Sequence, residues 1–323
     1  MMDIAAIRTL THDDMEIVNT RIIKELYSDI ELIEIIGHYI IENGGKRFRP
    51  MITLLSAKAL NCQNTLYYDL AVIIEFIHTA TLLHDDVVDE SDMRRAKKTA
   101  NNIWGNAESV LVGDFLYSRA FEMMVASEKM PVMKVMARAT NKIAEGEVLQ
   151  LLNCHNTETT EATYFEVIER KTATLFSAAT QLGGIAADAN TEQLQALHDF
   201  GHYLGIAFQI LDDLIDYSDQ DVDIGKNVGD DLSEGKPTLP LIRALQTATE
   251  SQQERLKKAI NEGNIEMIDE VIEIIKSTDA IEYTRLKATE ITDKACQALD
   301  ILPASVYRDA LIGIAQHGLK RTY

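Results

Sequence analysis

Apolar residues recur along most of the chain at spacings of three and four, which is the period of an α-helix. The strongest run covers residues 66–90 and is apolar at nearly every position, so it predicts a helix that is buried on all sides. The same periodicity predicts helices over residues 15–43, 50–60, 102–128, 132–152, 160–187 and 192–217, with amphipathic helices from residue 241 onward. Alternating, β-branched segments are scarce, so the pattern favours an all-α fold.

The predicted helices are separated by short segments rich in glycine, proline or polar residues. Asn43-Gly44-Gly45 is a standard helix stop, and residues 153–156 and 219–235 interrupt the helical pattern later in the chain. No low-complexity linker or shift in composition divides the sequence. We therefore expect a single domain over residues 1–323, built as one large bundle of about a dozen helices.

The composition agrees with a soluble helical protein. Of the 323 residues 46% are apolar, while prolines (5) and glycines (16) are few. No run reaches about 18 uninterrupted apolar residues, and the first residues lack the basic and apolar segments of a signal peptide. The three cysteines show no metal-binding spacing, so we expect them to be reduced. These features predict a cytoplasmic protein without a transmembrane segment.

The charge pattern restricts the partners. A net charge of −20 argues against binding to nucleic acid or to a broadly anionic membrane surface. Cations nevertheless gather in the first half of the chain, at Lys46, Arg47, Arg49, Arg94, Arg95, Lys97 and Lys98. The segment from Lys46 to Pro50 opens a helix after a Gly-Gly turn, where free backbone N–H groups suit a phosphate, although a solvated basic loop fits the same residues.

Two acidic motifs have the same form. Asp85-Asp86-Val87-Val88-Asp89 ends the apolar run, and Asp212-Asp213-Leu214-Ile215-Asp216 ends the predicted helix over residues 192–217. Helical residues four apart lie about 40° apart around the axis, so the first and last aspartates of each motif share a face. Their carboxylates repel by roughly 0.2–0.5 kcal/mol even on an exposed helix, so a cation is expected beside them. Carboxylate oxygens suit Mg²⁺, which also binds phosphate oxygens.

Other residues leave two interpretations open. His78 lies seven residues before Asp85, nearly on the same helix face, and is either a core histidine or a substrate contact. A methionine cluster that includes Met124 and Met136 either fills a core or lines a cavity for a flexible apolar ligand. Lys171-Thr172 lies inside an otherwise apolar helix and needs polar partners. Metals, anion sites and an apolar cavity together predict chemistry on a prenyl diphosphate.

At this point the sequence resembles the trans-polyprenyl diphosphate synthases, and most closely the bacterial members that make octaprenyl diphosphate. The resemblance covers essentially the whole chain. Any one acidic motif is a weak signal, but all the motifs occur in family order. They are Gly44 to Pro50, Asp85 to Asp89 with Arg94-Arg95, Gly146 to Gln150, Lys171-Thr172, Phe208-Gln209 with Asp212 to Asp216, Gly225-Lys226 and Gly235 to Pro240. Ala96 and Lys98 depart from the family pattern only in the loop after Arg95.

The resemblance implies an α-helical bundle with a central cavity, a homodimer, and a role for most of these residues. Asp85, Asp89 and Asp212 would bind Mg²⁺, with Asp86, Asp213 and Asp216 holding metal-bound waters. The allylic diphosphate would be bound by Arg94, Lys171, Lys226 and Lys236. Isopentenyl diphosphate would be bound by Lys46, Arg49, His78 and Arg95. The oxygens of Thr172 and Gln209, beside Lys171, would face the developing allylic cation.

The implied reaction breaks the allylic C–O bond, lets the double bond of isopentenyl diphosphate attack the resulting cation, and then loses a proton. Each cycle adds five carbons. In this family bulky residues at the fourth and fifth positions before the first aspartate stop growth early, and here these residues are Thr81 and Ala80. We therefore expect a long product, octaprenyl diphosphate made from farnesyl diphosphate for quinone side chains. The floor of the tunnel would lie at Met124 and Met136 or near Ile74 and Ile77.

Three alternatives stay open. Heptaprenyl or nonaprenyl diphosphate would need only a different tunnel floor. A class I terpene cyclase also begins with an aspartate-rich motif, but it carries a different metal triad in place of the second Asp-Asp-x-x-Asp motif. A noncatalytic subunit of a heteromeric synthase has usually lost an acidic motif, and both are present here.

Overall fold

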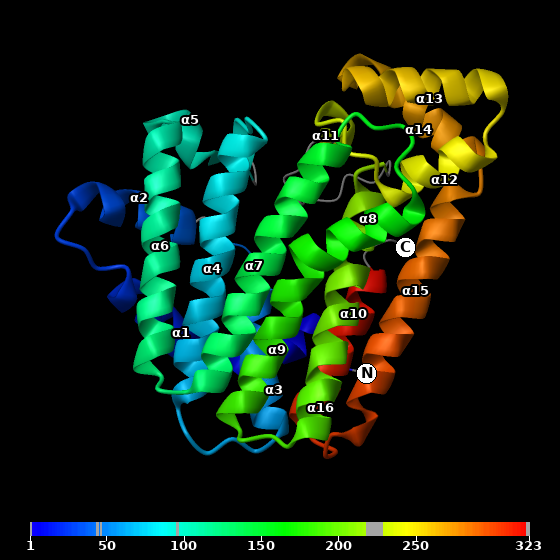
Figure 1. Ribbon diagram of the computed structural model, residues 1–323. Helices are drawn as coiled ribbons and strands as arrows, with labels where there is room; N and C mark the ends of the chain where they lie inside the picture. Colours follow the sequence, from blue (N-terminus) through cyan, green and yellow to red (C-terminus); the bar gives the residue numbers. More distant parts are fainter. Residues whose placement is uncertain (1, 43–44, 46, 95–96, 218–228, 321–323) are drawn as a thin grey trace. The chain divides into compact units, whose positions relative to one another are not determined.

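The computed structural model describes residues 2–42, 45, 47–94, 97–217 and 229–320 (Figure 1). Within these ranges the chain forms sixteen α-helices and almost no strand, which confirms the predicted all-α class. The helices are α1 (Ile4–Glu25), α2 (Glu31–Glu42), α3 (Phe48–Ala59), α4 (Leu66–Val88), α5 (Ala100–Trp104), α6 (Asn106–Ala126), α7 (Met130–Asn153), α8 (Glu161–Ile168), α9 (Thr174–Ala186), α10 (Thr191–Ile215), α11 (Asp230–Ser233), α12 (Leu239–Thr247), α13 (Glu250–Glu262), α14 (Ile268–Ser277), α15 (Ala280–Ala298) and α16 (Val306–Lys320).

Three short helical turns and one small hairpin complete the described chain. The π-helical turn η1 (Glu169–Ala173) lies between α8 and α9, and the 3-10 turns are η2 (Ile265–Met267) and η3 (Leu299–Ile301). Strands β1 (Met93–Arg94) and β2 (Lys97–Lys98) pair antiparallel.

Two of the predicted helices are each divided in two. The helix expected over residues 15–43 is α1 and α2, because Ser28 and Asp29 bond locally between them. Ser28 Oγ accepts from Ile30 N at 3.2 Å, and Asp29 accepts from the Tyr27 hydroxyl at 2.9 Å. Such local bonds compete with the helical ladder. The helix expected over 102–128 is α5 and α6, separated at Gly105, whose φ of +106° is outside the helical region.

The chain folds into two compact units, so the single domain over 1–323 stays a prediction. The first unit comprises residues 1–140, 175–201 and 298–314. At its centre α4 packs against α1, α3, α5 and α6. Among the described residues α4 is the one helix long and apolar enough to cross a membrane, and 72% of its most apolar window is buried inside the protein. It is therefore the central core helix of the unit, as residues 66–90 predicted.

The second unit comprises residues 141–174, 202–297 and 315–323. One of its apolar clusters joins α8, α10, α12 and α15, around residues such as Ile168, Ile210 and Ile242. Another joins α12, α13 and α14, around residues such as Leu241, Leu256 and Val271. The helices from residue 241 onward are amphipathic, as expected, and α12 to α15 bury apolar residues in these clusters.

Close helix packing in the first unit depends on Gly183 of α9. A Cβ atom there would clash with the backbone of α3, where Ala57 N would lie only 2.9 Å away. Because backbone atoms cannot turn aside as a side chain can, α3 and α9 approach each other this closely only with glycine at this position.

We predict that Gly183→Ala lowers the free energy of unfolding by about 1–3 kcal/mol, the usual cost of overpacking a core. Urea unfolding followed by circular dichroism measures it. Gly37→Ala is the matched control, because its new Cβ would meet only the end of the Leu26 side chain, at 3.0 Å. Equal unfolding midpoints for the two variants would contradict the prediction.

Candidate functional site

The first acidic motif forms the C-terminal end of α4. Asp85 and Asp89 are half-buried, whereas Asp86 is fully buried. Arg94 of β1 donates from Nε to Asp86 Oδ1 at 2.7 Å, and its Nη2 forms an ion pair with the same oxygen at 2.7 Å. Burial raises the pKa of Asp86, and the Arg94 cation partly offsets that increase. The structure thus brings Arg94 and the middle aspartate together and keeps the outer pair accessible.

The segment after α4 folds back onto the end of that helix. Ser91 N donates to Asp86 O at 3.0 Å, and Thr99 Oγ1 donates to Ser91 O at 2.6 Å. Asn101 of α5 donates to Asp86 O at 3.1 Å. These bonds fix the β1–β2 hairpin that carries Arg94. Arg95, predicted to contact isopentenyl diphosphate, lies outside the described residues.

Arg49 and His78 lie next to each other in the first unit. Arg49 Nη1 lies 3.0 Å from His78 Nε2, and the guanidinium stacks 4.4 Å above the ring of Phe176. Arg49 comes from the first turn of α3 and His78 from α4, so the α3–α4 packing determines their separation. Lys46, the third residue predicted here, lies outside the described residues.

In the second unit the second acidic motif is part of a hydrogen-bonded chain. Thr172 Oγ1 donates to Gln209 Oε1 at 3.0 Å, and Gln209 Nε2 donates to Asp213 Oδ1 at 2.8 Å. The other oxygen, Asp213 Oδ2, accepts from the hydroxyl of the buried Tyr164 at 2.6 Å. Thr172, Gln209 and Asp213 are therefore joined by consecutive hydrogen bonds. Asp212, next to Asp213 in the sequence, is half-buried.

Tyr164 was missed by the sequence reasoning. Its side chain is only 4% exposed, and a buried tyrosine hydroxyl needs a hydrogen-bond partner. A tyrosine in a largely apolar predicted helix indicates that such a partner exists. The sequence does not indicate which residue it is, because Asp213 is 49 positions away along the chain.

Burial governs the protonation of Asp213. Loss of water raises its pKa from 3.8 to about 8, and the negative charge of Asp231 adds to the increase, whereas the bonds from Tyr164 and Gln209 oppose it. Asp216 is also buried, and its Oδ2 accepts from Asp231 N at 3.2 Å.

Lys171 and Thr172 lie on the π-helical turn η1, which packs against Gly146 of α7. A Cβ at Gly146 would lie 2.7 Å from Lys171 N, so glycine permits this approach. Lys171 Nζ pairs with Glu147 Oε2 at 2.6 Å. Gly146 and Glu147 therefore support the turn that carries Lys171. Single π turns occur frequently at functional sites.

The loop before α12 carries another predicted cation. Lys236 forms an ion pair with Glu234, and its backbone N donates to Asp231 O at 2.8 Å. Gly235 adopts a φ of +66° and packs against the ring of His155, whose backbone N donates to Gly235 O at 2.7 Å. Lys226, predicted to bind the same diphosphate, lies outside the described residues.

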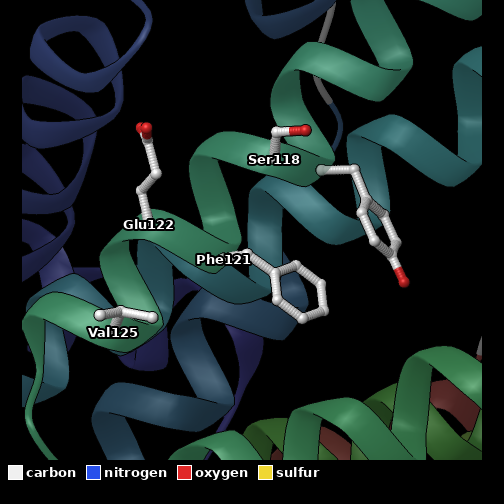
Figure 2. A pocket seen from close by; sticks show the side chains of 5 residues that line it. Ser118, Phe121, Glu122 and Val125 are labelled. Carbon is white, nitrogen blue, oxygen red and sulfur yellow. The ribbon is translucent and has the colours of Figure 1, made fainter.

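The residues predicted to set chain length all lie in the first unit. Ala80, Met124 and Met136 have no exposed surface, and Thr81 Oγ1 donates to His78 O at 2.8 Å. Figure 2 shows an open pocket of about 700 Å³ on α6, lined by Tyr117, Ser118, Phe121, Glu122 and Val125. None of the predicted chain-length residues lines that pocket, so their role in a tunnel stays a prediction.

The acidic side chains have the chemistry that Mg²⁺ requires. Asp86 Oδ2 is buried and has no hydrogen-bond partner among the described residues, so it can accept a bond from a metal-bound water. Among all the residues that the structure describes, no three His, Cys, Asp or Glu side chains are grouped so that they could hold a metal ion by themselves. Mg²⁺ is commonly held without one, by one or two carboxylates together with waters and substrate phosphates.

Comparison with known proteins identifies the family. The Polyprenyl synthetase family model matches residues 30–276. The chain belongs to the polyprenyl synthetase family. Octaprenyl diphosphate synthase of Escherichia coli (strain K12) is 50% identical to this polyprenyl synthetase over 321 residues, which cover 99% of each chain. All-trans-nonaprenyl-diphosphate synthase (geranyl-diphosphate specific) of Rhodobacter capsulatus is 45% identical over 295 residues, 91% of this chain and 90% of the other.

A solved structure gives the same result for the polyprenyl synthetase fold. Polyprenyl synthase from Caulobacter crescentus CB15, complexed with calcium and isoprenyl diphosphate, superposes with a TM-score of 0.94 at 42% identity, covering 98% of this chain and 97% of the other. The predicted family is therefore confirmed together with the fold. The roles of individual residues stay predictions.

The raised pKa of Asp213 gives a pH-dependence with a definite sign. Between about pH 4 and pH 8 the native state holds a proton on Asp213 that the unfolded chain has lost, so stability falls as pH rises. Without divalent cations, we predict that the unfolding free energy of wild type falls by about 1.4 kcal/mol per pH unit relative to Asp213→Asn.

Urea unfolding between pH 5.5 and 8 measures that difference. Asp188→Asn is the control, since it removes a mostly exposed carboxylate and should keep the wild-type slope. Parallel pH profiles for wild type and Asp213→Asn would contradict a raised pKa.

Proposed function

We propose that this polyprenyl synthetase is a trans-prenyltransferase that makes octaprenyl diphosphate by repeated addition of isopentenyl diphosphate to an allylic diphosphate, with farnesyl diphosphate as the starter. The observation that carries the proposal is the 50% identity to an octaprenyl diphosphate synthase over 99% of both chains. Both acidic motifs and their neighbouring cations are present, which argues against a noncatalytic subunit. The second Asp-Asp-x-x-Asp motif argues against a terpene cyclase.

In the proposed mechanism the first unit supplies one set of binding groups. Asp85 and Asp89 would hold Mg²⁺, and Asp86 would accept from a metal-bound water. Arg94 would bind the allylic diphosphate, and its bond to Asp86 already orients it at the end of α4. Arg49 and His78, with Lys46 and Arg95, would bind isopentenyl diphosphate. The guanidinium has five N–H donors, so those that Asp86 does not use would bind phosphate oxygens while the ion pair stays intact.

The second unit supplies Asp212 for Mg²⁺, with Asp213 and Asp216 supporting it, and Lys171, Lys226 and Lys236 for the allylic diphosphate. When bound, Mg²⁺ would supply positive charge that stabilises the departing diphosphate. Thr172 directs its hydroxyl hydrogen at Gln209 Oε1, which leaves the Thr172 lone pairs to face the developing allylic cation. Gln209 is held in that orientation because its Nε2 donates to Asp213. Preorganised dipoles of this kind stabilise charge that develops in a transition state.

The bond changes balance without a further reactant. The allylic C–O bond breaks, the double bond of isopentenyl diphosphate attacks the allylic carbon, and the proton lost from the adduct goes to the released pyrophosphate. The product is again an allylic diphosphate, five carbons longer. Exclusion of water from the predicted apolar cavity would protect the cation from hydrolysis.

Chain growth needs space beside Ala80 and Thr81, and both are small. Each buried CH₂ of the growing tail contributes about 0.8 kcal/mol, so a tail of this length is held firmly and is expected to leave slowly, by contact with a bilayer. We propose a cytoplasmic enzyme whose product supplies quinone side chains. Nonaprenyl and heptaprenyl diphosphate remain the competing products.

We also propose a homodimer. Leu111 and Val125 on α6 are each 65% exposed, and the open pocket shown in Figure 2 lies on the same helix. Large apolar side chains exposed together commonly mark a protein interface. Light scattering after size-exclusion chromatography tests the assembly, and a monomeric mass at micromolar concentration would contradict it.

The function is tested by incubating the purified protein with farnesyl diphosphate, isopentenyl diphosphate and Mg²⁺, then separating the dephosphorylated products. We predict a main product of forty carbons. Asp212→Asn should lower kcat by about 10²–10³-fold, because the Mg²⁺ that would stabilise the departing diphosphate loses a carboxylate ligand. No elongation by the wild-type chain alone would overturn the proposal.

The length prediction has a separate test. Ala80→Tyr should shorten the product to about fifteen or twenty carbons, because the ring would occupy the path of the tail. Ala80→Ser is the control, since it keeps the residue small and should preserve the wild-type length. An unchanged length in Ala80→Tyr would remove Ala80 from the tunnel wall.

A further inference from the structure

Arg47 has a backbone conformation that is unfavourable for its residue type. Its φ is +52° and its ψ +36°, in the left-handed region that glycine adopts more readily than arginine. It stands immediately before α3 and makes no side-chain cap to that helix. Such a conformation persists only where surrounding contacts enforce it, so we expect contacts of the Arg47 side chain to hold the residue in place.

Two contacts hold that side chain. Arg47 Nη1 forms an ion pair with Glu75 of α4, and Nη2 donates to Ile41 O near the end of α2 at 2.7 Å. The two charged side chains are only 14% and 6% exposed. Arg47 therefore ties α2, the start of α3 and the middle of α4 together from inside the first unit. A lone charge at either position would be buried without compensation.

The same two helices carry Arg49 and His78. Arg49 follows Arg47 by two residues, and Glu75 precedes His78 by three residues on α4. The Arg47–Glu75 pair and the 3.0 Å contact between Arg49 and His78 thus run side by side from α3 to α4. Glu75 neutralises Arg47, whereas Arg49 lies against the ring of a histidine.

We infer that the Arg47–Glu75 pair positions Arg49 and His78 to bind the diphosphate of isopentenyl diphosphate. Arg47 and Glu75 do not touch the substrate themselves. The inference rests on the proposed function and concerns the affinity for isopentenyl diphosphate alone, not that for the allylic diphosphate. A pair that merely stabilised the fold would affect both substrates, or neither.

Glu75→Gln removes the carboxylate charge with almost no change of shape, so the buried ion pair that holds Arg47 is lost. We predict that the KM for isopentenyl diphosphate rises about tenfold or more, while kcat and the KM for farnesyl diphosphate change less than about twofold. Calorimetric titration with isopentenyl diphosphate should show the same loss of affinity without turnover. Arg47→Lys, which cannot reach both Glu75 and Ile41 O, should give a smaller rise of the same kind.

A double variant separates positioning from stability. Arg47→Met with Glu75→Leu removes both buried charges, so the melting temperature should return toward the wild-type value. The KM for isopentenyl diphosphate should nevertheless stay raised, because the link that orients Arg49 is still missing. Recovery of that KM together with the melting temperature would overturn the inference.

Asp69→Asn is the matched control. It breaks the Arg21–Asp69 pair, which also joins a helix to α4 but is more exposed, and it should leave both KM values unchanged. An unchanged KM for isopentenyl diphosphate in Glu75→Gln, or equal rises for both substrates, would also overturn the inference. Failure of the proposed function looks different, because the wild-type chain would then not elongate farnesyl diphosphate at all.

Discussion

Two carboxylates in this protein are buried at the centre of an acidic motif, and the surrounding structure depends on how each is compensated. Asp86 is compensated by a cation, because Arg94 Nε donates to one of its oxygens and Nη2 lies beside the same oxygen. Among the described residues the donors to Asp213 are neutral, Tyr164 and Gln209. Burial, and then the negative charge of Asp231, raises the pKa of Asp213 to about 8, because neutral donors favour the charged carboxylate less than a cation does.

This difference assigns different work to the two motifs. The first motif holds the guanidinium of Arg94, which the short β1–β2 hairpin carries, at the end of α4. The second uses its buried carboxylate to orient an amide, and the amide orients the Thr172 hydroxyl. In the first motif both outer aspartates stay half-buried, and in the second Asp212 does, whereas the middle residue of each motif is buried and organises its neighbours.

Much of this could be predicted from sequence, and the failures have physical causes. Helical periodicity identified the buried helix over residues 66–90, and the order of the motifs identified the family. The breaks between α1 and α2 and between α5 and α6 were missed. They depend on local hydrogen bonds of Ser28 and Asp29 and on the φ of Gly105, which hydrophobic periodicity does not detect. Tyr164 and Glu75 were missed because each acts through a partner distant in sequence. A polar residue in an apolar helix shows that a partner exists without showing which residue it is.

The π-helical turn at Glu169–Ala173 has an evolutionary consequence. Its widened ladder, in which Thr174 N donates to Glu169 O, accommodates one residue more than a regular α-helix would. Deleting a single residue there would give a regular helix and keep the faces of the flanking segments, because the turn already absorbs the extra residue, but it would remove the widened turn itself. Lys171 or Thr172 would then leave the position that Gly146 and Gln209 define. Deletions in this segment should therefore be rarer among active descendants than substitutions are, even though they would make the helix more regular.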